Sequence, residues 1–318
     1  MKKIILISLA LCLAVAASAQ ETYLFAQRDT CSLYLDIFRP TEGSETTFEG
    51  KEKPAIIYIF GGGFLMGQRV DDFKREWFQR LNDNGYALIT IDYRLGMKGY
   101  RIGKGLSGLK KASDRFYQSQ QMGVEDLFSA ISFLAENRDE LGIDPSNLVV
   151  SGSSAGAIVS LAAEYDIVCG RTAGLPDGFQ FKGVMSFAGG VVSLNGVPRY
   201  PSAPCPTLLM HGTADGAVAY DKLCLGGRGI WGSSFLAEQW ARKGYTGWCI
   251  YRFKDRPHDI ASYMNYLWDI EQAFLEQNVI LGSPRRVDAM VDDPTLPSWA
   301  ITRINLNDIA EYTNTVSD

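Results

Sequence analysis

The stretch "NLVVSGSSAGAIVSLAA", residues 147–163, decides how this chain is expected to fold. An apolar run typical of a buried strand, Leu148 to Ser151, meets a run of small residues typical of a helix. Between them lies "GSSAG", a G-x-S-x-G motif in the strand–turn–helix setting of a nucleophile elbow. The turn is so sharp that side chains at Gly152 and Gly156 would clash with neighbouring backbone. We therefore predict that Ser154, framed by both glycines, is a nucleophile, rather than part of a Ser/Gly turn that only begins a helix.

A serine hydroxyl needs an adjacent base, and the chain has only two histidines, His211 and His258. Sheet enzymes with this elbow place the acid and then the histidine after the serine. Asp215 and His258 fit that order, and each follows a predicted strand. We predict a triad of Ser154, Asp215 and His258, and interpret His211 as a loop-shaping residue. Two acidic neighbours of His258 point poorly at its ring and stay as minor rivals for the acid: Asp255 and Asp259.

A second glycine-rich turn, in "AIIYIFGGGFLMG" at residues 55–67, ends another apolar run. Attack on an ester carbonyl creates an oxyanion, which needs N–H donors already aimed at it. Gly62 and Gly63 can offer such groups with no side chain in the way, and Ala155 can supply a third. A phosphate-binding loop is excluded because its Lys and Ser/Thr are missing. The loop is therefore predicted to form an oxyanion hole.

Apolar runs alternate with helical patterns along the chain, which favours an α/β fold with a mostly parallel central sheet flanked by helices. The predicted strands span residues 56–60, 87–92, 148–151, 183–187, 207–210 and 248–253, after an earlier pair within 21–38. The predicted helices span residues 124–138, 155–164, 235–243 and 260–281. Two glycine-containing stretches interrupt this rhythm, residues 95–121 and 220–234. We expect them to be long, irregular, lid-like insertions, with solvated surface decoration as the alternative.

The first 19 residues have the pattern of a secretory signal peptide. Lys2 and Lys3 precede an apolar run from Ile4 to Ala16, and three small residues follow. We expect cleavage near Ala19 and a periplasmic or extracellular mature protein. The catalytic domain is predicted to span residues 20–282, with a polar tail at 283–318 packed on it or extending from it.

Charge and cysteine content exclude several classes of partner. The formal charge is −5, and loss of Lys2 and Lys3 takes it to −7, so the protein is a poor candidate for nucleic acid or anionic membranes. No CxxC pair exists and histidine is scarce, so no metal is expected. After Cys12 an odd number of cysteines remains, so at least one thiol is unpaired. Their pairing and the oligomeric state stay open; the cysteines are Cys31, Cys169, Cys205, Cys224 and Cys249.

Four motifs, in order, resemble the α/β-hydrolase superfamily in its carboxylesterase and hormone-sensitive-lipase-like branch. They are "IIYIFGGGFLMG", "LITIDYRLG", "DELGIDPSNLVVSGSSAGA" and "HGTADGAV", and the resemblance runs from about Pro54 to His258. It implies a nucleophile, an acid, a base and three oxyanion donors, in turn Ser154, Asp215, His258, and Gly62, Gly63 and Ala155. The chain departs from the family pattern at Phe60, where His is usual, and at Ser153, where Asp or Glu is common.

The sequence thus predicts an exported serine esterase that works through an acyl-enzyme and needs no cofactor. We expect short, acetyl-type acyl groups on a polar alcohol or carbohydrate, because residues 95–121 show no sustained apolar stripe for a long chain. One alternative is a serine exopeptidase of the same fold, although an acidic pair to capture an amino terminus is not evident. The other is a non-catalytic ligand-binding homologue, against which the intact serine, acid and base argue.

Overall fold

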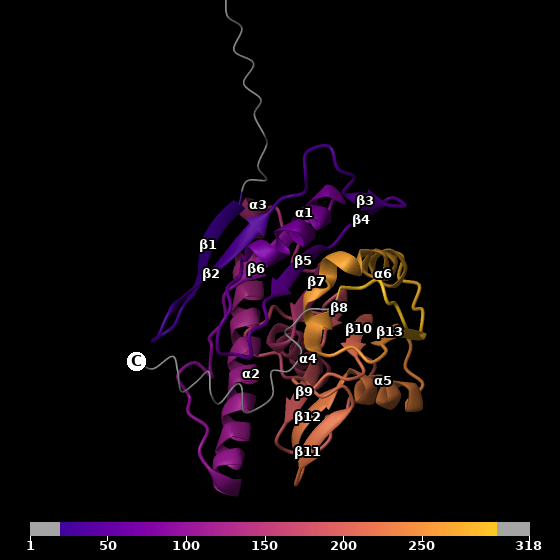
Figure 1. Ribbon diagram of the computed structural model, residues 1–318. Helices are drawn as coiled ribbons and strands as arrows, with labels where there is room; N and C mark the ends of the chain where they lie inside the picture. The colour runs from indigo at the N-terminus through magenta and orange to yellow at the C-terminus, as the bar shows by residue number, and fades with distance from the viewer. Residues whose placement is uncertain (1–19, 298–318) are drawn as a thin grey trace, which may run out of the picture.

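A nine-stranded sheet forms the centre of the computed structural model, which describes residues 20–297 (Figure 1). The strand order is β1-β2-β6-β5-β7-β8-β10-β13-β14. β1 and β2 pair antiparallel, β2 and β6 pair antiparallel, and all later neighbours are parallel. The strands are β1 (Gln20–Gln27), β2 (Ser32–Phe38), β5 (Ala55–Ile59), β6 (Leu88–Ile91), β7 (Leu148–Ser153), β8 (Gly183–Phe187), β10 (Thr207–Gly212), β13 (Trp248–Phe253) and β14 (Val287–Val291).

Helices cover both faces of this sheet, α1 and α6 on one and α2 and α4 on the other (Figure 1). The helices are α1 (Arg75–Asp83), α2 (Gly105–Glu136), α3 (Arg138–Leu141), α4 (Ala155–Val168), α5 (Ser233–Arg242) and α6 (Trp268–Phe274). Short 3-10 turns lie at Asp72–Lys74, His258–Ser262 and Met264–Tyr266, and α6 continues as a π-helical segment, Leu275–Ile280. The predicted helix 260–281 is therefore a series of shorter helical segments.

The parallel strands are continuous apolar runs because both of their faces are covered. Every residue of β5 and of β7 is buried, and so is every residue of β8 and of β10. The six predicted strands and the early strand pair are all present, with their ends moved by one or two residues. The predicted α/β fold class is confirmed.

The prediction of an irregular insertion at residues 95–121 is wrong in its second half, because α2 begins at Gly105 and runs unbroken to Glu136. Tertiary packing favours helix there. A side chain at Gly108 would meet the Gly103 carbonyl oxygen at 1.8 Å, so glycine lets the helix start pack on the preceding turn. Further along, Gln120 is buried and exchanges two hydrogen bonds with the backbone of Val192.

The second predicted irregular insertion, residues 220–234, is also ordered. It forms a hairpin of β11 (Lys222–Leu225) and β12 (Arg228–Gly232), and β12 pairs antiparallel with β9 (Gly190–Ser193). The glycines of the hairpin allow its tight turn and close packing, since a side chain at Gly229 would meet the Leu223 carbonyl at 2.0 Å. A third, two-stranded sheet pairs β3 (Thr47–Phe48) with β4 (Lys51–Glu52).

The stretch assigned to a polar C-terminal tail contributes a strand to the sheet. β14 extends β13 in parallel, with Cys249 opposite Val287 and Phe253 opposite Val291. An Arg252–Asp288 ion pair, Nε to Oδ1 at 2.6 Å, links the same two strands. The central sheet therefore continues past residue 282, where the sequence pattern placed the end of the catalytic domain.

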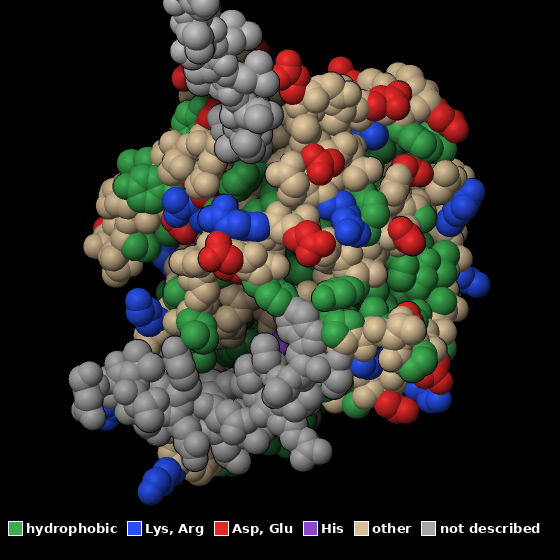
Figure 2. Space-filling view, turned by 45° about the horizontal axis from the view of Figure 1, so that its top comes forward, with side chains coloured by type: hydrophobic (Ala, Val, Ile, Leu, Met, Phe, Trp, Pro, Cys, Tyr) green, Lys and Arg blue, Asp and Glu red, His purple; other side chains and the backbone are tan. Residues whose placement is uncertain are grey.

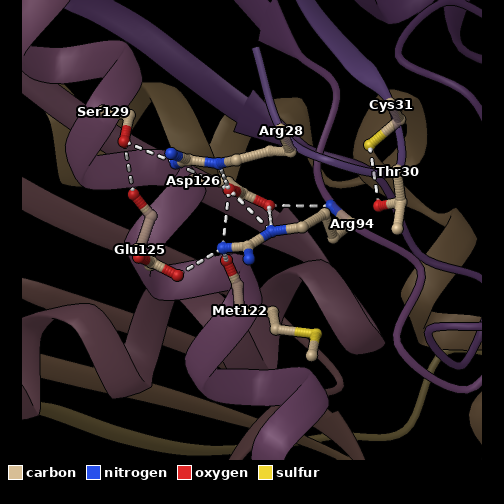
Figure 3. Close-up of polar contacts among 8 residues, drawn as sticks. All are labelled: Arg28, Thr30, Cys31, Arg94, Met122, Glu125, Asp126 and Ser129. Atoms are coloured by element: carbon tan, nitrogen blue, oxygen red, sulfur yellow. Dashed lines mark hydrogen bonds and ion pairs between the residues drawn. The ribbon is translucent and has the colours of Figure 1, made fainter. Parts of the chain in front are cut away.

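A buried ion-pair network holds the N-terminal strands against α2 (Figure 3). The Asp126 carboxylate is fully buried and pairs with Arg28 from the β1–β2 turn and with Arg94 from the loop after β6. The Arg94 backbone N–H also donates to Asp126 Oδ2 at 2.8 Å. The neighbouring Glu125 is largely exposed and binds Arg94 from outside. One carboxylate thus joins three segments that are far apart in sequence.

Other features of the described chain bear on the predicted classes. Among residues 20–297, no helix is long and apolar enough to cross a bilayer, and no three His, Cys, Asp or Glu side chains cluster as a metal site. All five cysteines in this range are free thiols. The predicted signal peptide, residues 1–19, lies outside the described residues.

Candidate active site

Ser154 lies at the sharp turn between β7 and α4. Its backbone has φ +52° and ψ −116°, a region that glycine favours and that side chains rarely adopt. Its N–H donates to the Phe187 carbonyl at 2.8 Å, which fixes the strained turn against β8. A side chain at Gly156 would meet the Ile59 carbonyl oxygen at 2.0 Å, and one at Gly152 would meet the Gly156 oxygen at 2.3 Å. Both flanking glycines are therefore required by contact, and the strain at the serine is typical of a functional position.

Hydrogen bonds join the three residues that the sequence nominated as a triad. His258 Nε2 lies 2.8 Å from Ser154 Oγ, and His258 Nδ1 lies 2.7 Å from Asp215 Oδ2. The three come from the ends of β7, β10 and β13, at the carboxyl edge of the sheet. The serine and the histidine are partly exposed and the aspartate side chain is buried. Such an arrangement can remove the proton from a serine hydroxyl.

Asp215 is held by four donors. Oδ1 accepts from the backbone N–H groups of Ala217 and Val218, at 2.8 and 2.9 Å. Oδ2 accepts from His258, and His211 Nε2 lies 3.2 Å from the same oxygen. Burial alone would raise the pKa of Asp215, but the hydrogen bonds from His211 and His258 outweigh it and hold that pKa well below its ordinary value. The carboxylate is therefore charged and fixed in orientation.

The two rival acids lie elsewhere. Asp259 is buried, but its Oδ2 faces Arg256 Nη2 at 2.6 Å and the Tyr263 hydroxyl at 2.7 Å. Asp255 is exposed on the loop after β13. The geometry therefore brings Asp215, and neither neighbour, to the His258 ring.

The histidine ring is reachable from solvent. Figure 2 shows a small area of histidine surface inside a hollow of the visible face, and His211 is fully buried. His258 is partly exposed, with 12% of its side chain accessible to solvent.

The predicted oxyanion loop lies directly beside the nucleophile. A side chain at Gly61 would meet the Cβ of Ser154 at 3.2 Å. Gly62 and Gly63 have φ of +115° and +64°, so the turn requires left-handed backbone. Within residues 20–297, the N–H groups of these two glycines bind no acceptor. Ala155 is the first residue of α4, whose leading N–H groups have no acceptor inside the helix. Three N–H groups without an acceptor among the described residues thus lie on the two segments that meet at the serine.

Sequence reasoning gave no role to Tyr93, which anchors this loop. Phe60, which stands where the family has His, is buried against the Tyr93 ring with centroids 4.5 Å apart. The Tyr93 hydroxyl donates to the Phe60 carbonyl at 3.0 Å. Phe64, with an unusual φ of +62°, packs edge-on against both Tyr93 and Phe116 of α2. The tyrosine of the motif "IDYRLG" is the sequence feature that marks this anchor.

The sheet order, the elbow and the hydrogen-bonded trio together define an α/β-hydrolase. The chain is of the carboxylesterase type: the Carboxylesterase family model matches residues 10–163. A thermophilic esterase of Thermogutta terrifontis, esterase 2, has a similar fold, with a TM-score of 0.56 at 20% identity over 83% of this chain and 94% of that one.

Curated relatives are similar over part of their length. Para-nitrobenzyl esterase of Bacillus subtilis is 31% identical over 46% of this chain and 26% of that protein. Chlorogenic acid esterase of Aspergillus niger is 28% identical over 42% and 24%. Bile salt-activated lipase of Bos taurus is 29% identical over 47% and 23%. The chain thus spans about a quarter of the length of these relatives.

Proposed function

We propose that the protein hydrolyses carboxylic esters through a covalent acyl-enzyme on Ser154. The observation that carries the proposal is the continuous path of hydrogen bonds from Ser154 Oγ through His258 to Asp215, at 2.8 and 2.7 Å. In the first half-reaction, Ser154 Oγ attacks the ester carbonyl carbon while His258 Nε2 takes the hydroxyl proton. Asp215 stabilises the imidazolium that forms. The oxyanion is stabilised by the N–H groups of Gly62, Gly63 and Ala155.

Loss of the alcohol ends the first half-reaction, and water then restores the serine. Collapse of the first tetrahedral intermediate breaks the bond to the alcohol oxygen, and His258 returns its proton to that leaving group. Water then attacks the acyl carbon and gives a proton to His258 Nε2. Collapse of this second intermediate breaks the bond between the acyl carbon and Ser154 Oγ, His258 returns the proton to Oγ, and the carboxylic acid leaves. Every proton in this cycle passes through one ring nitrogen, which the 2.8 Å contact supports.

The test is covalent labelling of the nucleophile. A fluorophosphonate probe should react with the wild-type protein and with no site in Ser154→Ala. Ser154→Ala and His258→Ala should each remove nearly all turnover of p-nitrophenyl acetate, and the double variant should be little worse, because the residues act as a unit. A folded wild-type protein that neither reacts with the probe nor turns over an ester would refute the proposal.

We further propose that the acyl group is short and the alcohol polar, such as a sugar. Esterase 2 of Thermogutta terrifontis, which shares the fold, has been solved with propionate and with butyrate bound. The first turns of α2 expose Lys110 and Lys111 beside two exposed leucines, Leu106 and Leu109, and Phe116 of the same helix packs on Phe64 of the oxyanion loop. A long alkyl chain gains about 0.8 kcal/mol only for each methylene it buries, and the charged start of α2 offers it no continuous apolar surface.

A series of p-nitrophenyl esters tests the substrate class. The kcat/KM should peak at acetate to butyrate and fall by octanoate, and acetylated sugars should be cleaved. A kcat/KM that rises steadily to laurate would reject the short-acyl proposal while leaving the esterase proposal intact.

We also propose export after cleavage near Ala19, on the N-terminal pattern alone. Expression of the full chain in a bacterial host, followed by N-terminal sequencing of the protein from the periplasm and the medium, tests it. An uncleaved protein confined to the cytoplasm would contradict it.

A further inference from the structure

His211 is a fully buried histidine whose two ring nitrogens both have polar neighbours. It lies on β10, four residues before Asp215. Its Nε2 lies 3.1 Å from the Val218 carbonyl oxygen and 3.2 Å from Asp215 Oδ2. Its Nδ1 lies 2.8 Å from Ser233 Oγ. The ring thus touches the carboxylate that also contacts His258.

The contacts assign the proton on this ring. Both neighbours of Nε2 are acceptors, a carbonyl and a carboxylate, so Nε2 carries a hydrogen and shares it between them. In the neutral ring Nδ1 is then an acceptor. The Ser233 hydroxyl lies 3.2 Å from the Gly189 carbonyl oxygen and 2.8 Å from Nδ1, and the shorter contact favours donation to the ring. Asp215 Oδ2 therefore has an imidazole nitrogen on each side, His258 Nδ1 at 2.7 Å and His211 Nε2 at 3.2 Å.

The same ring joins both ends of the β11–β12 hairpin. Val218 lies in the segment that enters the hairpin, and Ser233 is the residue that follows it, at the start of α5. The entering and leaving segments also touch each other, since Ser234 N–H donates to the Tyr220 carbonyl at 3.0 Å. His211 therefore lies where the two ends of the β11–β12 hairpin meet the loop that carries Asp215.

We propose that His211 is a positioning residue for the catalytic acid: its Nε2–H holds Asp215 Oδ2, and Ser233 holds the ring in the tautomer that can do so. The inference rests on the proposed function, because the orientation of Asp215 affects a rate only if the triad is at work. It gives His211 a part in the reaction beyond shaping a loop, although the ring touches neither the substrate nor Ser154.

Few other charges face this ring. The Tyr220 ring packs edge-on against it with centroids 5.6 Å apart. The Tyr220 hydroxyl in turn meets Arg252 Nη1 of β13 at 2.6 Å, and Arg252 is paired with Asp288 of β14. On the other side of Asp215 stands His258, while Arg256 of the same loop is paired with Asp259. Asp215 is thus the charged group that His211 contacts directly, and the others are matched by partners of their own.

The test compares two replacements of the ring. His211→Phe keeps an aromatic of similar size and removes the donor, and His211→Gln keeps an N–H donor of similar reach. His211→Phe should lower kcat for p-nitrophenyl acetate about tenfold or more, with little change in KM, because the acid is no longer held. The acidic limb of the profile of kcat/KM against pH should also move to higher pH. The reason is that the Asp215 carboxylate, once it has lost a donor, stabilises the His258 imidazolium more strongly. His211→Gln should recover most of both changes, and Ser233→Ala should fall between them.

A control separates positioning from stability. Leu208→Ala, in the same strand and equally buried, should lower the melting temperature without moving the acidic limb. If His211→Phe does not fold, His211→Asn replaces it, because its shorter amide cannot reach Asp215. An acidic limb that stays in place for every folded His211 variant, with kcat falling only as far as in Leu208→Ala, would overturn this inference alone. A wild-type protein that fails to react with a fluorophosphonate would overturn the proposed function and this inference with it.

Discussion

The ring of Phe60 stacks on the ring of Tyr93 with centroids 4.5 Å apart, and the Tyr93 hydroxyl donates to the Phe60 carbonyl at 3.0 Å. Phe60 precedes the triple glycine, so this pair fixes the start of the loop that offers N–H groups beside Ser154. The family pattern has a histidine at position 60, and a side-chain hydrogen bond from that residue is not possible here. The tyrosine on the neighbouring strand end supplies the anchor instead, by stacking on the ring and by bonding the carbonyl of the same residue.

Tyr93→Phe should weaken catalysis more than it weakens the fold. The substitution keeps the stacked ring and removes one hydrogen bond, which is worth about 1 kcal/mol of unfolding free energy. A looser oxyanion loop should lower kcat several-fold and leave KM nearly unchanged, because the donors act mainly in the transition state. The control is Tyr86→Phe, since the buried Tyr86 hydroxyl bonds to no residue within 20–297. Equal kcat losses in both variants would show that the Tyr93 hydroxyl has no specific role.

The two glycines predicted as oxyanion donors should differ sharply in what they tolerate. A side chain at Gly62 would meet the Met66 carbonyl oxygen at 2.0 Å, whereas one at Gly63 would meet only a Leu65 methyl at 3.7 Å. Gly62→Ala should therefore move the loop and lower kcat by about 100-fold, the usual effect of losing one oxyanion donor. Gly63→Ala should cost about 1 kcal/mol of left-handed backbone strain and a smaller part of kcat. Steady-state kinetics and urea unfolding of both variants measure the difference, and equal losses would reject the steric argument.

The sequence allowed prediction of those parts of the site that depend on local geometry. The elbow needs two glycines at fixed positions around one serine, and the acid and base follow strands whose apolar runs are plain in the sequence. The N–H donors follow from the glycine run for the same reason. Contacts between side chains that are far apart in the sequence leave no comparable pattern in it. Neither the second imidazole on Asp215 nor the stacking of Phe60 on Tyr93 could be predicted.

The predictions for the two insertions, residues 95–121 and 220–234, are wrong for a related reason. Three glycines within residues 103–108 lower the helix signal, but α2 is stabilised from outside by Phe116 against Phe64 and by Gln120 on the β9 backbone. The β11–β12 hairpin is likewise stabilised by β9, which ends about thirty residues before the hairpin begins. Local composition predicts loops there, and tertiary pairing overrides it.

Stability should depend on pH through a buried carboxyl far from the triad. Burial raises the pKa of Glu164 to about 7, although the Cys205 N–H donates to its Oε1 at 2.7 Å. Between pH 4.5 and 7 the folded protein keeps a proton that the unfolded chain has lost, so the unfolding free energy falls as the pH rises through this window. Glu164→Gln, which cannot ionise, should lack this loss. Its stability relative to wild type should rise by on the order of 3 kcal/mol from pH 5 to pH 8.

Urea unfolding at the two pH values measures this change for Glu164→Gln. Glu238→Gln serves as the control, because Glu238 is exposed and pairs with Arg242 at the surface, 2.8 Å between Oε2 and Nη2. Its stability relative to wild type should be nearly the same at pH 5 and pH 8. A Glu164→Gln variant that behaves like this control would mean that Glu164 is ionised in the folded protein at neutral pH.

Removing either of two adjacent carboxylates on α2 should lower the unfolding free energy, but by amounts that differ several-fold. Asp126 is fully buried between Arg28 and Arg94, with closest side-chain contacts of 2.9 Å to each, and Glu125, which also binds Arg94, keeps 63% of its side chain exposed. Asp126→Ala leaves two arginines without their buried partner and should cost about 3–5 kcal/mol of unfolding free energy. Glu125→Ala removes an exposed partner and should cost less than about 1 kcal/mol, a loss that salt reduces further. Urea unfolding at low and high ionic strength measures both. Equal losses, or an Asp126→Ala penalty that added salt abolishes, would show that the network is solvated and does not hold the N-terminal strands to α2.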